Sequence, residues 1–126
     1  MTQLHYRRVL LKLSGEALMG QDAFGINQEA VANIVQEIKQ VVALGVEIAL
    51  VVGGGNIFRG VSIAGGGIER STADYMGMLA TIMNALALNE SLSAGQVPAR
   101  IQSALNLQQV VEAYARPKAL QRSEER

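Results

Sequence analysis

The chain has 126 residues, 49% of them hydrophobic and 17% charged, a composition that excludes a disordered protein and suits one globular domain. Its 11 Lys and Arg residues balance its 11 Asp and Glu residues, and this zero net charge argues against nucleic-acid or acidic-membrane partners. The chain has no cysteine and a single histidine, His5, so disulfides, thiol nucleophiles, His-based metal sites and Ser-His-Asp triads are excluded. The lack of cysteine weakly favours a reducing cytoplasm, and no apolar stretch approaches the length of a membrane span.

The first predicted element is a strand from Arg7 to Leu13, which Ser14 and Gly15 terminate. Lys12 lies at the end of this apolar run. One interpretation is an edge lysine whose ammonium group extends to water. The other is a cation at the carboxyl edge of a parallel sheet, where open α/β folds bind ligands. The strand alone leaves both interpretations open.

A helix is predicted to follow a loop from Met19 to Gly25. Asn27 is the expected N-cap and Gly45 the expected stop. Between them, hydrophobic residues recur on one helical face at Val31, Ile34, Val35, Ile38, Val41 and Val42. This pattern predicts the connecting helix of a right-handed βαβ unit.

The second predicted strand, Val46 to Val52, runs directly into the glycines of residues 53–55. Its hydrophobic run is typical of a parallel strand that is buried on both faces. The glycines permit a tight turn and the close approach of a ligand to the main chain, and Arg59 adds a guanidinium group suited to phosphate. Because neighbouring parallel strands end at the same edge, Lys12 and Gly53 are expected to be neighbours.

A long helix from Ser71 to about Ser91 is predicted after an irregular loop over residues 57–67. Ser71 and Asp74 have the spacing of a capping box, which is one interpretation of Asp74. The helix is apolar nearly all round, with large residues at Met76, Met78, Leu79, Ile82, Met83, Leu86 and Leu88. Such a helix is covered on more than one side, and a second subunit is the simplest cover.

The last part of the chain is predicted to contain a third short strand, Val97 to Ala104, and a helix, Leu105 to Ala115. Pro117 is expected to break that helix, because proline cannot continue the hydrogen-bonding pattern. Residues 118–126 could begin another helix but have little to bury.

The three glycines at residues 53–55, called the glycine-rich loop from here on, match neither common nucleotide-binding motif. No Gly-Lys-Ser or Gly-Lys-Thr follows it, as a Walker loop requires. Phe58 stands where a dinucleotide fingerprint has Gly or Ala, which makes a dinucleotide oxidoreductase a weak alternative. Lysine, arginine and backbone amides are instead the groups on which phosphoryl transfer depends.

Three segments together resemble bacterial uridylate kinase (UMP kinase), a family with the amino-acid-kinase fold. They start at Lys12 (KLSGEAL), Gly53 (GGGNIFRG) and Asp74 (DYMGMLATIMN), and the resemblance covers about residues 7–117. Related kinases share the first segment, whereas the third separates uridylate kinase from them. The resemblance implies a three-layer α/β/α sandwich with a mainly parallel sheet. It also implies ATP-dependent phosphorylation of UMP to UDP with Mg²⁺.

The resemblance further implies roles for individual residues. Lys12 and Arg59 would be catalytic. ATP would contact Lys12, Leu13, Ser14, Gly15, Gly55 and Arg59, and UMP would contact Gly54 and Asp74, the latter through its ribose hydroxyls. The loop that responds to GTP would comprise Gly20, Gln21, Asp22, Ala23, Phe24 and Gly25. The family implies a cytoplasmic homohexamer with GTP as an activator and UTP as an inhibitor; no nucleic acid, membrane or resident metal is expected.

Family chains continue for about as long again, so residues 1–126 would be the amino-terminal portion of a single amino-acid-kinase domain. The half that holds adenine would be absent, and a truncated gene product, a frameshift and a fragment all fit. Two functions remain open: a UMP kinase impaired by truncation, and a non-catalytic nucleotide-binding or oligomerising fragment. A sheet cut part-way leaves an exposed hydrophobic edge, so we expect marginal stability or aggregation.

Overall fold

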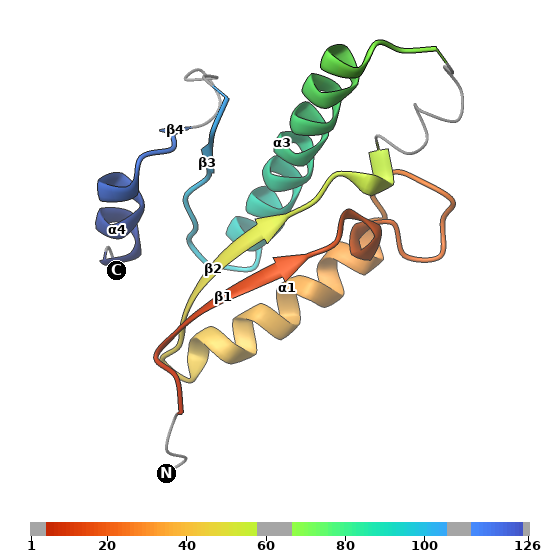
Figure 1. Ribbon diagram of the computed structural model, residues 1–126. Helices are drawn as coiled ribbons and strands as arrows, with labels where there is room; N and C mark the ends of the chain where they lie inside the picture. The colour runs from red at the N-terminus through yellow and green to blue at the C-terminus, as the bar shows by residue number, and fades with distance from the viewer. Residues whose placement is uncertain (1–4, 58–66, 106–111, 125–126) are drawn as a thin grey trace.

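The computed structural model describes residues 5–57, 67–105 and 112–124. The chain begins with a parallel βαβ motif (Figure 1). Strand β1 spans Arg8–Leu13, helix α1 spans Gln28–Ala43 and strand β2 spans Glu47–Val52. The two strands pair in parallel along their whole length, from Arg8 opposite Glu47 to Leu13 opposite Val52. The predicted strand–helix–strand order is therefore confirmed.

Both predicted ends of α1 are also confirmed. The Asn27 side-chain oxygen accepts a hydrogen bond from the Ala30 amide at 2.9 Å, which satisfies one of the unpaired donors of the first turn. Gly45 has φ of 93°, a left-handed conformation that glycine adopts without steric cost, and it ends the helix. These signals are local, so the sequence carries them completely.

The hydrophobic core lies on one face of the β1–β2 sheet. Helix α3, Arg70–Ala94, packs beside α1 there. Seven buried residues form the core cluster: Leu18, Val31, Val35, Ile38, Leu88, Leu92 and Val97. Leu13, Ile48, Leu50 and Val52 of the strands pack against them. In the described part of the chain, no helix has the length and hydrophobicity required to span a bilayer.

The opposite face of the sheet is exposed. Side chains alternate across a strand, so Leu10 and Val51 point away from the core, and 72% and 48% of their surfaces are accessible. The prediction that β2 is buried on both faces is therefore wrong for this chain. The reason is tertiary, because an apolar residue is buried only if another element covers it.

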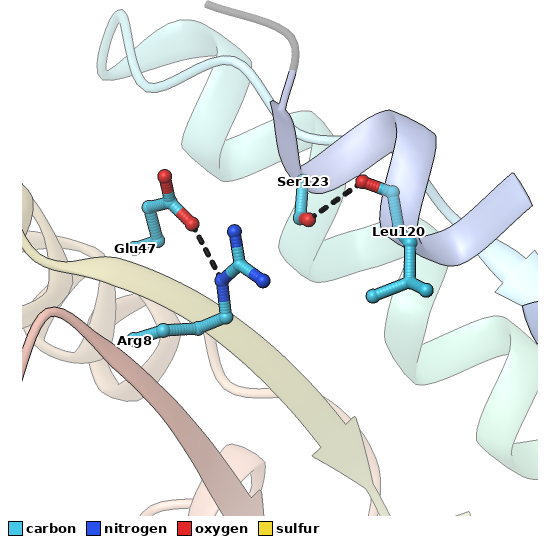
Figure 2. Close-up of polar contacts among 4 residues, drawn as sticks. All are labelled: Arg8, Glu47, Leu120 and Ser123. Atoms are coloured by element: carbon cyan, nitrogen blue, oxygen red, sulfur yellow. Dashed lines mark hydrogen bonds and ion pairs between the residues drawn. The ribbon is translucent and has the colours of Figure 1, made fainter. Parts of the chain in front are cut away.

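An ion pair links the strands at their amino ends, far from the glycine-rich loop. Arg8 Nε donates to Glu47 Oε2 at 2.7 Å, and these two residues are also opposite each other in the sheet register (Figure 2). The pair is solvent-accessible, so it stabilises the fold by at most about 1 kcal/mol. Figure 2 also shows the last turn of α4 (Arg116–Glu124), where Ser123 Oγ donates to the Leu120 carbonyl oxygen at 2.8 Å.

The carboxyl-terminal predictions need three corrections. The third strand is short: β3 covers only Gln102–Ser103 and pairs in parallel with β4, Glu112–Ala113. The predicted helix over 105–115 is wrong at β4, and its residues 106–111 lie outside the described residues. Pro117 does not break a helix, because it lies in the first turn of α4, Arg116–Glu124. There its fixed φ and missing N–H are tolerated.

Candidate functional site

The candidate site lies at the carboxyl edge of the β1–β2 sheet. Leu13 and Val52 are paired at this edge, and the Gly53 amide donates to the Leu13 carbonyl oxygen at 2.9 Å. Lys12, opposite Val51, is exposed one residue before the edge. The expected proximity of Lys12 to the glycine-rich loop is confirmed. Exposure is required by both interpretations of Lys12, so it does not choose between water and phosphate.

Residues 14 and 15 form the turn that follows β1. Ser14 caps a short 3-10 helix, η1 (Gly15–Leu18), by accepting a hydrogen bond from the Glu16 amide at 3.2 Å. A Cβ atom on Gly15 would lie 2.6 Å from Asn56 Oδ1 and 2.7 Å from the Gly55 nitrogen. These distances are too short for any side chain, so glycine at this position lets the turn pack directly on the glycine-rich loop. Sequence reasoning predicted neither η1 nor this contact.

The glycines of the loop are required for different reasons. A Cβ on Gly54 would lie 2.8 Å from the Ala80 Cβ and 3.1 Å from the Gly77 carbonyl oxygen, both on α3. Gly54 therefore allows the loop to touch the helix. By contrast, the nearest atom to a Cβ on Gly55 would be the Glu16 Cγ at 4.0 Å. Packing within the described chain does not explain Gly55, because no other described atom outside its own turn comes within 4 Å of that Cβ.

Asp74 is exposed on α3, near the contact between this helix and the loop. It precedes Gly77 by three residues, which puts the two on the same helical face about 4.5 Å apart along the axis. The capping-box interpretation is wrong, because α3 begins at Arg70 and Ser71 already lies inside it. The N-cap is Glu69, whose side chain makes no capping hydrogen bond. Asp74 is thus left without the structural role that the spacing suggested.

The loop from Gly20 to Gly25 lies against the glycine-rich loop. The Gly25 amide donates to the Asn56 carbonyl oxygen at 2.8 Å, and the Asn56 side-chain nitrogen donates to the Gly25 carbonyl oxygen at 2.9 Å. Within the loop, Asp22 Oδ2 accepts a hydrogen bond from Asn27 Nδ2 at 3.0 Å. Phe24 is exposed. The expected GTP-responsive segment therefore adjoins the expected phosphate loop.

Sequence reasoning missed Asn56 and Asn84. Asn84 is a polar residue in the middle of the apolar stretch of α3, and its side chain is completely buried. Asn56 keeps only 1% of its accessible surface. A buried polar residue needs hydrogen-bond partners, so an asparagine among apolar helical positions was the available signal of a buried polar contact.

Arg59, a predicted site residue, lies outside the described residues. Among those residues no group of three His, Asp or Glu side chains is arranged to hold a metal ion.

A comparison with protein-family models matches residues 7–125 to the amino acid kinase family. Two solved UMP kinases superpose closely on the chain. The enzyme from Bacillus anthracis has 39% sequence identity and a TM-score of 0.86, over 94% of this chain and 49% of its own. The enzyme from Ureaplasma parvum has 29% identity and a TM-score of 0.81, over 95% of this chain and 52% of its own.

A more distant similarity supports the fold alone. Carbamate kinase from Giardia lamblia, solved with AMP-PNP bound, has 16% identity and a TM-score of 0.58 over 78% of this chain and 39% of its own. The parallel β1–β2 sheet with α1 and α3 on one face thus belongs to the α/β fold of these kinases, as predicted. This chain spans about half the length of the two UMP kinases that it matches.

Proposed function

The chain belongs to the amino acid kinase family, and on that premise we propose that it is the amino-terminal portion of a uridylate kinase domain. The complete domain would transfer a phosphoryl group from ATP to UMP. The observation that carries the proposal is the match to the Bacillus anthracis UMP kinase, with 39% identity over 94% of this chain. Two contacts support it: Lys12 lies in the strand pair that ends at the glycine-rich loop, and Gly54 of that loop packs against the part of α3 that carries Asp74.

In the proposed reaction, a phosphate oxygen of UMP attacks the γ-phosphorus of ATP. The bond from that phosphorus to the β–γ bridging oxygen breaks, and UDP and ADP result. Lys12 and Arg59 would stabilise the negative charge of the transferring group. Magnesium would enter with ATP and offset the charge of its phosphates.

Each nucleotide would have its own contacts in the proposed site. ATP phosphates would lie against Lys12, Leu13, Ser14, Gly15, Gly55 and Arg59. The lack of close neighbours to a Gly55 Cβ among the described residues supports this assignment, since a glycine that packing does not require leaves room for a ligand. UMP would lie at Gly54 and Asp74, and the carboxylate of Asp74 would accept hydrogen bonds from the ribose hydroxyls.

Regulation and assembly belong to the same proposal. GTP would activate through Gly20–Gly25, and UTP would inhibit. Hexamer formation would use the exposed apolar side of α3, where Tyr75, Leu79 and Met83 follow one another at intervals of four residues.

Because the chain spans 49% of the Bacillus anthracis enzyme, we propose that turnover needs a second half. The same fact favours the alternative function, a fragment that binds nucleotide or self-associates without catalysis. An assay of UDP formation from UMP and ATP with the 126-residue chain should detect no turnover. Robust turnover would disprove the requirement for further residues.

Calorimetric titration with UMP tests the site itself. The Asp74→Ala variant should bind UMP about 10- to 100-fold more weakly, the range expected when hydrogen bonds to a charged group are lost. Glu90→Ala, which removes an exposed carboxylate from the far part of the same helix, is the matched control and should bind normally. If the native chain and Asp74→Ala bind equally, or neither binds measurably, the proposed UMP site is wrong.

A further inference from the structure

Two asparagines make up the buried polar side chains of the described residues. Asn56 and Asn84 retain 1% and 0% of their accessible surface. They come from different elements, since Asn56 directly follows the glycine-rich loop and Asn84 lies in the middle of α3. Burial of a side-chain amide is unfavourable unless its hydrogen-bonding groups find partners, so these residues need an explanation beyond core packing.

The two side chains bind each other reciprocally, and we call them the amide pair. Asn56 Nδ2 donates to Asn84 Oδ1 at 3.0 Å, and Asn84 Nδ2 donates to Asn56 Oδ1 at 2.7 Å. Each nitrogen also donates outward, from Asn56 to the Gly25 carbonyl oxygen at 2.9 Å and from Asn84 to the Gly53 carbonyl oxygen at 2.7 Å. All four side-chain N–H groups are thereby used.

The chemistry of the pair is specific to asparagine. Each side chain must supply two donors and one acceptor within a short reach. Aspartate has the same shape but no donor when ionised, leucine has neither donor nor acceptor, and glutamine is longer by one methylene group. The pair therefore reports a requirement for these bonds rather than for a side chain of this volume.

The outward bonds join two segments that are distant in sequence. Gly53 opens the glycine-rich loop, and Gly25 closes the Gly20–Gly25 loop. The main chain adds a second link, because the Gly25 amide donates to the Asn56 carbonyl oxygen at 2.8 Å. Gly15 packs on the same group, since a Cβ there would lie 2.6 Å from Asn56 Oδ1. A displacement of either loop must therefore strain or break bonds of the amide pair.

We infer that Asn56 and Asn84 are positioning residues that make the two loops one cooperative unit. The amide pair holds the backbone amides of the glycine-rich loop in place for phosphate and transmits a ligand's effect on one loop to the other. By thermodynamic linkage, this coupling is reciprocal. A phosphate ligand at Gly53–Gly55 lowers the population of open conformations of Gly20–Gly25, and a ligand at Gly20–Gly25 does the same for the glycine-rich loop. The ligand-linked part of this inference rests on the proposed function, whereas the coupling of the loops does not.

The coupling is tested by amide hydrogen exchange in the 126-residue chain without nucleotide. In Asn84→Ala, exchange of the Gly25 amide should become about tenfold faster, which is the effect of one lost buried hydrogen bond. Asn84 bonds to Asn56 and Gly53 and not to Gly25, so this acceleration would have to pass through Asn56. Amides of Val35 and Ile38 in α1 should keep their rates. Asn33→Ala, which removes an exposed asparagine from α1, is the control and should leave Gly25 unchanged. Unchanged exchange at Gly25, or equal acceleration throughout the chain, would overturn the coupling.

Two further measurements keep the test decisive if Asn84→Ala fails to fold. Asn84→Asp preserves the shape, replaces the two donors by a carboxylate oxygen, and should accelerate Gly25 exchange at least as much. In the native chain, the amides of Gly25 and Ile57 should share one opening free energy and one dependence on low denaturant concentration, because they belong to one unit. Different dependences would reject the inference without any variant.

A nucleotide titration then separates this inference from the proposed function. Addition of UMP or ATP should slow Gly25 exchange in the native chain and have no effect on it in Asn84→Ala. If the native chain binds neither nucleotide, the proposed function fails while the coupling measured without ligand stands. If nucleotide binds and protects the glycine-rich loop but never Gly25, the transmission is disproved and the proposed function survives.

Discussion

At the scale of single residues, the glycines of this chain are explained by contacts rather than by flexibility. Gly15 and Gly54 stand where a Cβ would collide with main-chain atoms or with α3, whereas a Cβ on Gly55 would meet no described atom closer than 4.0 Å. The sequence shows the same letter at all three positions. Only the packing separates a glycine that brings elements together from a glycine that leaves room for a ligand.

This difference predicts that two alanine substitutions affect different properties, stability in one case and ATP binding in the other. Gly54→Ala should lower the free energy of unfolding by about 1–3 kcal/mol, the usual cost of overpacking, because its Cβ would meet α3 at 2.8 Å. Gly55→Ala should leave stability nearly unchanged and weaken the binding of ATP. Urea denaturation measures the first effect and calorimetry the second. Equal stability losses in the two variants would contradict the packing argument.

At the scale of secondary structure, the ends of α1 were predictable, whereas α3 was predictable as a helix but its N-cap was not. Asn27 and Gly45 act on the backbone next to them, so their effects can be read from neighbouring residues. The start of α3 depends on where the helix packs, and it puts Glu69 at the N-cap instead of Ser71. Glutamate is too long to serve as an efficient cap at this position.

The uncapped end of α3 can therefore be improved. Glu69→Asp keeps the charge and shortens the side chain, so that its carboxylate can accept a hydrogen bond from the Thr72 amide. The substitution should raise the free energy of unfolding by about 0.5–1 kcal/mol, as measured by urea denaturation. Glu69→Ala is the control and should give no gain. An aspartate variant no more stable than the alanine variant would show that this helix end is not limited by its cap.

At the scale of the whole molecule, the dominant feature is the sheet face left without a cover. Leu10 and Val51 are exposed on it, while α1 and α3 cover the other face. The chain spans about half of the UMP kinases that it resembles. A complete α/β/α sandwich would cover both faces, so the exposed face is what we expect if, as proposed, the chain is one portion of a larger domain.

An exposed apolar sheet face favours association, so the isolated chain should aggregate as its concentration rises. Leu10→Lys should raise the soluble concentration, because it replaces an apolar side chain that is 72% exposed on the uncovered face. Gln40→Lys adds the same charge on the exposed side of α1 and should help much less. Sedimentation velocity measures both variants. A sharp cooperative melt of a soluble native monomer would contradict the prediction.

The sequence by itself determined the βαβ order, both caps of α1, the proximity of Lys12 to the glycine-rich loop and the kinase family. All of these depend on local patterns or on the fixed geometry of parallel strands. The tertiary structure alone decided that Asp74 does not cap a helix, that Gly54 packs on α3, and that Asn56 and Asn84 join two loops. These features depend on contacts between residues far apart in the chain, which no local pattern records. The exposure of one sheet face is decided the same way, since burial depends on what covers a surface and not on the residues that form it.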